Sequence, residues 1–79
     1  MKPKFKVGDI LLYNRPGDAL RIIIVGIDDA HYHICLEKNY SEYLLSVLRN
    51  EFSYYCYDYR HRYIEEDCVA VGNINDTQI

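Results

Sequence analysis

Apolar and polar residues alternate at the start of the chain with the two-residue period of a β-strand. Phe5 and Val7 alternate with lysines, which gives this segment one apolar face. Gly8-Asp9 interrupts the alternation, and an apolar run at 10–13 follows it. A glycine at such a break is typical of a turn or a bulge. The pattern therefore predicts a turn at Gly8 and a short strand at 10–13.

Two longer strands are predicted between residues 20 and 37. The segment 14–18 contains Pro-Gly, a turn signal, and the run at 20–27 is rich in β-branched residues. A continuous apolar run of this kind is typical of a central strand that is covered on both faces. A polar turn at 28–31 then leads into a regular alternation at 31–37. One face of this strand carries Tyr32, Ile34 and Leu36, and the other carries His31, His33, Cys35 and Glu37.

The apolar period changes to that of a helix over 41–50. Ser41 is a suitable N-cap, and Asn50 can end the helix. Four apolar residues fall on one helical stripe: Leu44, Leu45, Val47 and Leu48. A helix of nine or ten residues is marginal in isolation. We therefore expect this helix to dock on the domain through its leucines.

Five of the nine tyrosines lie between residues 52 and 63. Alternation over 52–59 predicts a strand with Phe52, Tyr54 and Cys56 toward the core and Tyr55, Tyr57 and Tyr59 on the other face. Two interpretations of these last three tyrosines remain open. They either form an exposed contact ladder or pack under the 41–50 helix, in which case Tyr55 and Tyr57 have low exposure.

The pattern over 60–71 predicts a polar corner after the tyrosine strand, then a helical turn and a last strand. Arg60-His61-Arg62 forms a polar corner that we expect to be exposed in every arrangement. The segment 64–68 has the pattern of a single helical turn with Ile64 and Cys68 directed inward, and 69–71 follows as a short strand. Together the segments predict a β-rich α+β fold with about five strands and one short inserted helix. We expect a single domain at 1–72 and a flexible tail at 73–79.

Composition narrows the class of protein. Twelve acidic residues against nine basic ones give a net charge of −3, which argues against a binder of duplex nucleic acid. Three cysteines cannot pair fully, and no apolar signal segment follows Met1. The longest apolar run is far too short to span a bilayer. We therefore expect a cytoplasmic protein with reduced thiols and without a membrane partner.

Candidate catalytic and metal-binding groups are present but lack the usual spacing. His31, His33 and Cys35 share a strand face, and a zinc site could be drawn with Cys56, His61 or Cys68. The spacing is not that of structural zinc sites, and no orienting group or phosphate-binding glycine loop accompanies the cysteines and histidines. We therefore expect neither a metal nor another cofactor, and no enzymatic activity.

Tyrosine and arginine at the corner are the better candidates for function, because both residue types are enriched at binding hot spots. The expected binding residues are Tyr55, Tyr57, Tyr59, Arg60, His61, Arg62, Glu65 and Glu66. A protein partner is the first expectation. A nucleotide or short single-stranded nucleic acid, stacked on tyrosines with phosphates at the arginines, is the alternative. Homo-oligomerisation through exposed tyrosines is a third interpretation.

The motif Phe5-x-Val7-Gly8-Asp9-Ile10, with Tyr63-Ile64-Glu65-x-x-Cys68-x-x-Val71 near the end, resembles the opening and closing segments of small SH3-like β-barrels. The order of elements is also similar to that of short uncharacterised proteins of bacteriophages and prophages. The resemblance covers roughly 5–37 and 60–72, and the helix at 41–50 departs from it. It implies a partly open barrel that binds peptides, proteins or nucleic acids. Its most concrete version is a small phage-type accessory protein that binds and inhibits a host protein.

Overall fold

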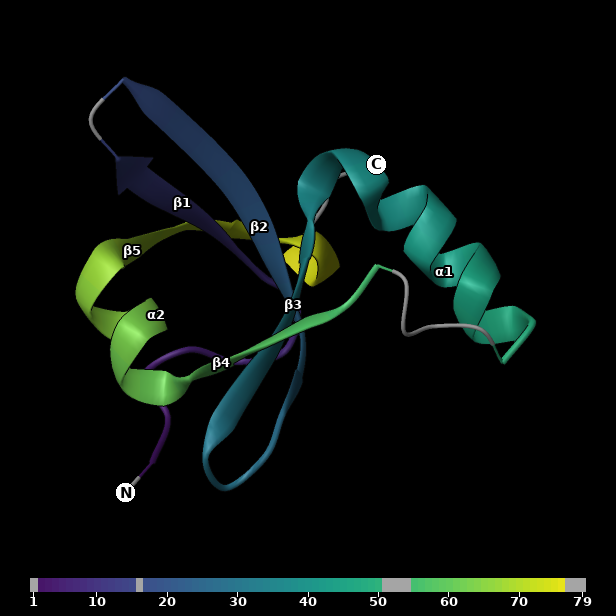
Figure 1. Ribbon diagram of the computed structural model, residues 1–79, viewed down its shortest axis with the longest axis horizontal. Helices are drawn as coiled ribbons and strands as arrows, with labels where there is room; N and C mark the ends of the chain where they lie inside the picture. The colour runs from purple at the N-terminus through teal and green to yellow at the C-terminus, as the bar shows by residue number, and fades with distance from the viewer. Residues whose placement is uncertain (1, 16, 51–54, 77–79) are drawn as a thin grey trace.

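Five strands form one antiparallel sheet in the order β4-β3-β2-β1-β5 (Figure 1). The computed structural model describes residues 2–15, 17–50 and 55–76. The strands are β1 (Asp9–Arg15), β2 (Asp18–Ile27), β3 (His31–Leu36), β4 (Tyr57–Arg60) and β5 (Cys68–Asn73). The helices are α1 (Tyr40–Leu48) and α2 (His61–Asp67), with the short 3-10 turns η1 (Glu37–Asn39) and η3 (Ile74–Asp76).

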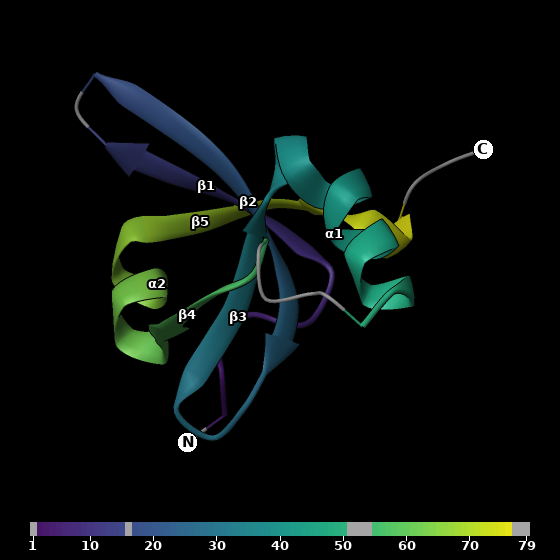
Figure 2. The ribbon, with the colours of Figure 1, turned by 45° about the vertical axis from the view of Figure 1, so that its right-hand side comes forward.

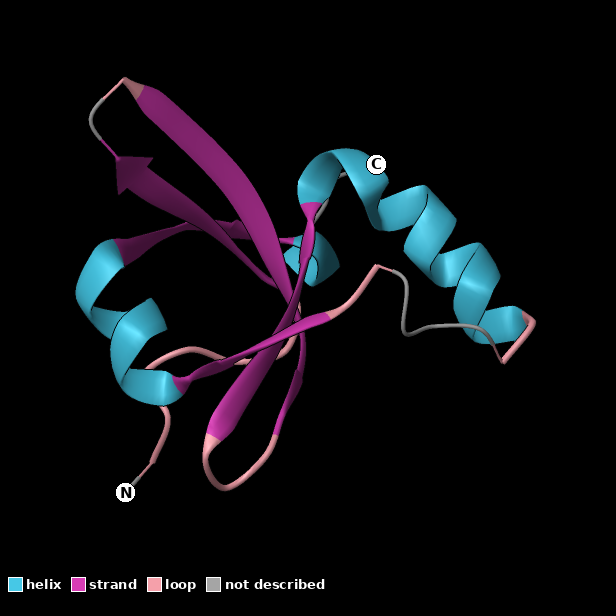
Figure 3. Ribbon diagram, viewed as in Figure 1, coloured by secondary structure: helices cyan, strands magenta, loops and turns pink. Residues whose placement is uncertain are grey.

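The two edge strands, β4 and β5, are joined directly by α2 (Figure 3). β1 pairs with β2 and β5, β2 pairs with β3, and β3 pairs with β4, all antiparallel. The predicted β-rich α+β class, with five strands and a helix inserted before the fourth, is confirmed. The sheet is open, because the described parts of β4 and β5 do not pair with each other.

The main core lies on one face of the sheet and is covered by α2. Ile64 on α2 and Cys68 at its end are 2% and 3% exposed, so the prediction that both point inward is confirmed. The cluster consists of Phe5, Leu11, Ile22, Ile24, Tyr32, Ile34, Ile64 and Cys68. Ile23 and Cys35, which pair across β2 and β3, are also buried but lie on the opposite face. The expectation that the second strand is covered on both faces is therefore confirmed.

Helix α1 is present where the sequence predicts it, but it docks by a different face. Asn50, with a φ of 59°, follows its last turn as expected. The prediction that the leucines dock is wrong: Leu48 is 81% exposed, and Leu44, Leu45 and Val47 are also exposed. Ser46 is buried and Tyr43 is half-buried instead. Burial, followed by its neighbours Cys56 and Cys35, raises the pKa of Tyr43.

Two tyrosines of α1 face the sheet in place of the leucines. Cys35 is fully buried there, and the phenol rings of Tyr40 and Tyr43, which stack 6.2 Å apart, supply the contact area from successive turns of the helix. The leucine stripe is rotated away from this face. In two views, α1 and α2 lie on opposite sides of β3 (Figure 2).

We expect substitutions on the leucine face and on the tyrosine face of α1 to differ in their effect on the free energy of unfolding. Leu48→Gln should change the free energy of unfolding by less than about 0.5 kcal/mol, because the side chain is already in water. Tyr43→Ala should cost about 2 kcal/mol, since it removes a partly buried ring. Urea unfolding of both variants measures the difference. A cost for Leu48→Gln as large as that for Tyr43→Ala would mean that the leucines dock after all.

Strand β4 presents its tyrosines on the face opposite to the one predicted. Tyr59 pairs with Tyr32 and Tyr57 pairs with Ile34, so both tyrosines share the core face of the sheet. They remain 46% and 47% exposed because they lie on the edge strand. The exposure of Tyr57 contradicts the interpretation in which α1 covers it. The predicted strand also included 52–54, which lie outside the described residues, and the described strand begins at Tyr57.

The predicted turn at Gly8-Asp9 ties the N-terminal segment to the last strand. The buried carboxylate of Asp9 accepts hydrogen bonds from Lys6 N at 3.0 Å and Asn73 Nδ2 at 2.9 Å. Ile74 N donates to Gly8 O at 2.9 Å. The structure thus places 73–76 in β5 and η3.

Candidate binding site

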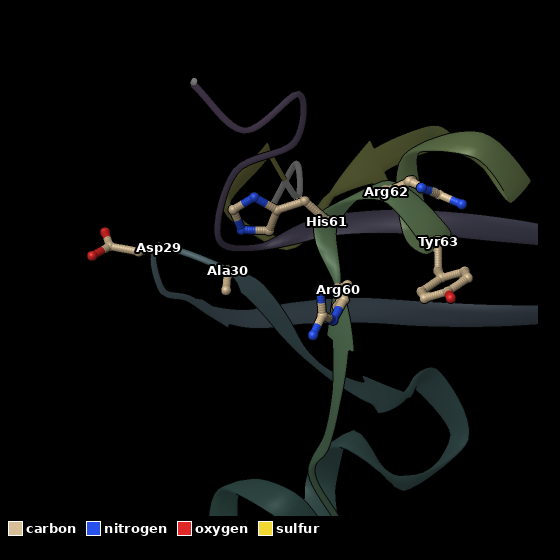
Figure 4. A pocket seen from close by; sticks show the side chains of 6 residues that line it. All are labelled: Asp29, Ala30, Arg60, His61, Arg62 and Tyr63. Atoms are coloured by element: carbon tan, nitrogen blue, oxygen red, sulfur yellow. The ribbon is translucent and has the colours of Figure 1, made fainter.

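A pocket of about 420 Å³ lies where β4 turns into α2. Arg60, in an extended conformation, ends β4, and His61 begins the helix. The turn between β2 and β3 forms the opposite wall. The pocket is lined by Asp29, Ala30, Arg60, His61, Arg62 and Tyr63 (Figure 4). We call this set the basic corner.

His61 holds the two walls of the basic corner together. Its Nε2 donates to the carbonyl oxygen of Asp28 at 3.0 Å, and its backbone N donates to Ala30 O at 3.2 Å. The imidazole also packs on the ring of Tyr32, with ring centroids 4.7 Å apart. These contacts make His61 a positioning residue that fixes the β2–β3 turn beside α2.

The two arginines of the basic corner have different surroundings. Arg62 lies over the ring of Tyr63, 5.8 Å from its centroid, with its Nε 3.8 Å from Glu66 Oε1. Figure 4 shows Arg60 between Ala30 and Tyr63, whereas Arg62 points away from Ala30. Within the described ranges of the chain, the guanidinium of Arg60 forms no ion pair or hydrogen bond. Arg60 is therefore the cation most available to a ligand.

A second hollow, of about 380 Å³, adjoins the basic corner, and three of its six lining residues are tyrosines. It is lined by Tyr13, Leu20, Tyr59, Tyr63, Ile64 and Asp67, and we call it the tyrosine groove. Tyr13 pairs with Leu20 across β1 and β2, and Tyr63 and Asp67 lie four residues apart on α2. Tyr63 lines both hollows, so the groove and the corner meet at this side chain.

This surface has the chemistry of a recognition site. The phenol rings and Leu20 can cover an apolar side chain, while the phenol hydroxyls provide directional hydrogen bonds. At the other end, Arg60 can form a two-point contact with a carboxylate or a phosphate. Asp67 adds a negative charge to the groove, so the two ends of the surface differ in sign.

The fold brings together four of the residues predicted to bind: Tyr59, Arg60, His61 and Arg62. The other four lie elsewhere. Tyr57 is exposed on the same sheet face as Tyr59, but it lines neither hollow. Tyr55 is half-buried before β4, and Glu66 is exposed beside Arg62.

Glu65 is engaged inside the protein. Its Oε2 accepts hydrogen bonds from Tyr32 OH at 2.5 Å and from Lys4 N at 2.8 Å. The backbone hydrogen bond from Lys4, followed by that from Tyr32, lowers the pKa of the Glu65 carboxyl. The carboxylate therefore fastens the N-terminal segment to α2 and β3.

Five residues of the tyrosine groove were absent from the predicted binding residues: Tyr13, Leu20, Tyr63, Ile64 and Asp67. The spacing of Tyr63 and Asp67 on one helical face was a usable signal, because residues four apart on a helix are neighbours. Tyr13 and Leu20 carried no such local signal. They reach the site only through the pairing of β1 with β2 and the position of α2.

Comparison with protein-family models, with curated proteins and with solved structures finds no match to this chain. The functional argument therefore rests on the geometry of the site itself. Among the described residues, no helix is long and apolar enough to cross a membrane.

Proposed function

We propose that this protein is a non-enzymatic binding module that holds a short segment of a partner protein in the tyrosine groove and the basic corner. One observation carries the proposal. Tyr13, Tyr59 and Tyr63, from three different elements, line one groove, and Tyr63 also lines the corner that holds Arg60, whose guanidinium is unpaired among the described residues. Tyrosine gives a large contact area at low entropic cost, and arginine gives direction.

The two ends of the surface define the chemistry of the segment. An apolar side chain fills the space between Tyr13 and Tyr63, and a carboxylate of the partner meets Arg60. Asp67 at the groove and Asp29 on the rim of the corner disfavour a second acidic group. The preferred segment is therefore apolar at one end and acidic at the other.

The strand order supports the proposal that the sheet belongs to a small, partly open SH3-like barrel, because one short helix joins its two edge strands. In the version implied by the resemblance to phage proteins, the partner is a protein of the host cytoplasm, and binding inhibits it. The groove supports the binding part of this proposal. Inhibition follows if the bound segment is one that the host protein needs free.

Selection from a display library of random peptides tests the proposal on the purified chain. We expect selected peptides to combine an apolar residue with an acidic one. Tyr63→Ala should weaken binding of such a peptide by about 30-fold, the loss typical of a central aromatic hot spot of about 2 kcal/mol. Arg60→Glu should weaken binding more than Tyr63→Ala does when the peptide has an acidic end. Fluorescence anisotropy of a labelled peptide measures both effects.

Tyr57→Ala is the matched control. Tyr57 and Tyr63 are 47% and 53% exposed, but only Tyr63 lines the groove. The control should bind the peptide as the unmodified chain does. Equal losses for both variants, with unchanged melting temperatures, would place recognition outside the groove and contradict the proposal.

A second candidate function is the binding of a nucleotide or a short single strand in the basic corner. The observation that favours it is the pocket of about 420 Å³ that combines Arg60 and Arg62 with the ring of Tyr63. Asp29 on the rim opposes a phosphate. Absorbance at 260 nm that survives purification and is lost in Arg60→Glu would support this function. Equilibrium dialysis without retention of ATP or of an oligonucleotide would contradict it.

A further inference from the structure

Three potential metal ligands meet on the face of the sheet opposite to the tyrosine groove. The ligand atoms of His33, Cys56 and Asp58 all lie within 4.8 Å of one another. His33 on β3 pairs directly with Asp58 on β4. Cys56 precedes Asp58 by two residues. The cluster thus combines a nitrogen, a sulfur and an oxygen donor from two neighbouring segments. The sequence offered His33 and Cys56 among several zinc ligands, but it did not indicate Asp58.

The ring of His33 is already oriented for coordination. Its Nε2 lies 3.1 Å from Asp28 Oδ2, and its Nδ1 contacts Asp58 Oδ1. Asp28 is itself fixed, because its Oδ1 accepts hydrogen bonds from Ala30 N at 2.8 Å and His31 N at 2.6 Å. A histidine that donates one N–H to a held carboxylate keeps its other nitrogen for a metal. Here that nitrogen is Nδ1, on the side of Asp58.

We propose that His33 Nδ1, Cys56 Sγ and a carboxylate oxygen of Asp58 bind a divalent ion of the zinc class, with Asp28 as the outer carboxylate that orients His33. Mixed thiolate, imidazole and carboxylate donors suit Zn²⁺. In a tetrahedral zinc site, donor atoms lie about 3.3 to 3.8 Å apart, so small side-chain rotations that part the contact between His33 Nδ1 and Asp58 Oδ1 would admit the ion. The side chain of Asp58 is 59% exposed, which leaves the fourth position to water.

The proposed metal site does not depend on the proposed function. It includes Asp58 of β4, the strand that also carries Tyr59 and Arg60. Asp58 and Tyr59 point to opposite faces of β4, which is only four residues long. Such a short edge strand is held weakly. An ion that links β3 to β4 through His33 and Asp58 would fix the strand that presents Tyr59 and Arg60 to the groove.

The first test titrates Zn²⁺ into the purified full chain, in the presence of a phosphine reductant, by calorimetry and thermal unfolding. We expect saturation at one ion per chain and a melting temperature that rises with zinc concentration. Co²⁺ is the second probe, because a thiolate ligand gives it a charge-transfer absorption band in the near ultraviolet. That band should be present in the unmodified chain and absent in Cys56→Ser.

Matched variants separate the ligands from their neighbours. His33→Gln and Asp58→Asn should lose zinc binding, whereas the controls His31→Gln and Asp29→Asn should keep it. Asp28→Asn should weaken zinc binding roughly 10- to 100-fold, as the loss of an orienting partner does. The melting temperature of each variant in a chelator shows that it is folded.

Two outcomes overturn the assignment. One is a folded, reduced chain that gives neither a zinc-binding heat nor a cobalt charge-transfer band. The other is a band that survives in Cys56→Ser or is lost equally in His31→Gln. Should Cys56→Ser unfold, the cobalt spectrum of folded His33→Gln decides, since the proposal requires altered coordination there.

Discussion

We expect Tyr32→Phe to lower the free energy of unfolding by about 2 to 3 kcal/mol, although it removes a single oxygen atom. The ring of Tyr32 is fully buried, and its hydroxyl donates to Glu65 Oε2 at 2.5 Å and accepts from Phe5 N at 3.1 Å. Phenylalanine preserves the packing but leaves the Phe5 N–H without an acceptor, and it leaves the Glu65 carboxylate with Lys4 N as its remaining donor. Urea unfolding measures the loss.

Two controls distinguish the hydrogen bonds of Tyr32 from the general cost of losing a phenol hydroxyl. Tyr57→Phe removes the same atom from an exposed ring on the neighbouring strand and should have almost no effect. Combining Tyr32→Phe with Glu65→Gln should cost less than the sum of the two single changes, because both act on one hydrogen bond. If the two single losses of free energy simply add in the double variant, the hydrogen bond between Tyr32 and Glu65 contributes nothing to stability.

The same hydroxyl makes stability sensitive to alkaline pH. Burial, followed by the hydrogen bond to Glu65, raises the pKa of Tyr32 from 10.0 to about 12. A group whose pKa is higher in the folded state binds more protons there, so folding should lose stability as the pH rises from about 10 to about 12. Tyr32→Phe should remove this part of the alkaline loss, which denaturant midpoints across that range would show.

The elements that the sequence predicts well are those set by local periodicity. Alternation at 31–37 predicted a strand that the structure gives as His31–Leu36, and the four-residue separation of Ile64 and Cys68 correctly placed both in the core. The turn at Gly8 was predicted because glycine breaks an alternating run. In each case the deciding residues are neighbours in the chain, so the pattern carries the information.

The sequence predicted less well which face of a strand or helix points to the core, because this depends on packing partners that are distant in sequence. Alternation correctly grouped Tyr57 with Tyr59, but only the register against β3 determines which face they share. The leucine stripe of α1 was a good guide to a helix and a poor guide to its docking. The stacked rings of Tyr40 and Tyr43 supply that contact instead, and Leu48 stays in water.

The same distinction explains the candidate site. The sequence predicted Tyr59, Arg60 and Arg62 as candidates because they are concentrated in one stretch. Tyr13 and Leu20 were not predicted, because their approach to Tyr63 requires the β1–β2 hairpin and α2 to be in place. His33 and Cys56, likewise, become neighbours only through the position of β4 beside β3.

The second large effect on stability is expected at Gly8. Its φ of +93° is unfavourable for any residue with a Cβ, and a Cβ there would lie 2.8 Å from Asn75 Nδ2 and 3.1 Å from Asn73 Oδ1. Asn73 also donates to the buried Asp9, so it cannot move freely. We expect Gly8→Ala to lower the free energy of unfolding by about 2 to 4 kcal/mol, from backbone strain and crowding together.

Two other glycines allow these contributions to be separated. Gly17 also has a positive φ, of 78°, but no atom in the described part of the chain lies within 4 Å of a Cβ there, so Gly17→Ala should cost only the backbone strain of about 1 kcal/mol. Gly72 lies in β5 with its nearest atom 3.9 Å from a Cβ, so Gly72→Ala should be neutral or slightly stabilising. Urea unfolding should therefore rank the three variants as Gly8, Gly17, Gly72 in decreasing cost. Equal losses for Gly8→Ala and Gly17→Ala would mean that Asn73 and Asn75 do not anchor the N-terminal turn to β5, and that backbone conformation alone requires this glycine.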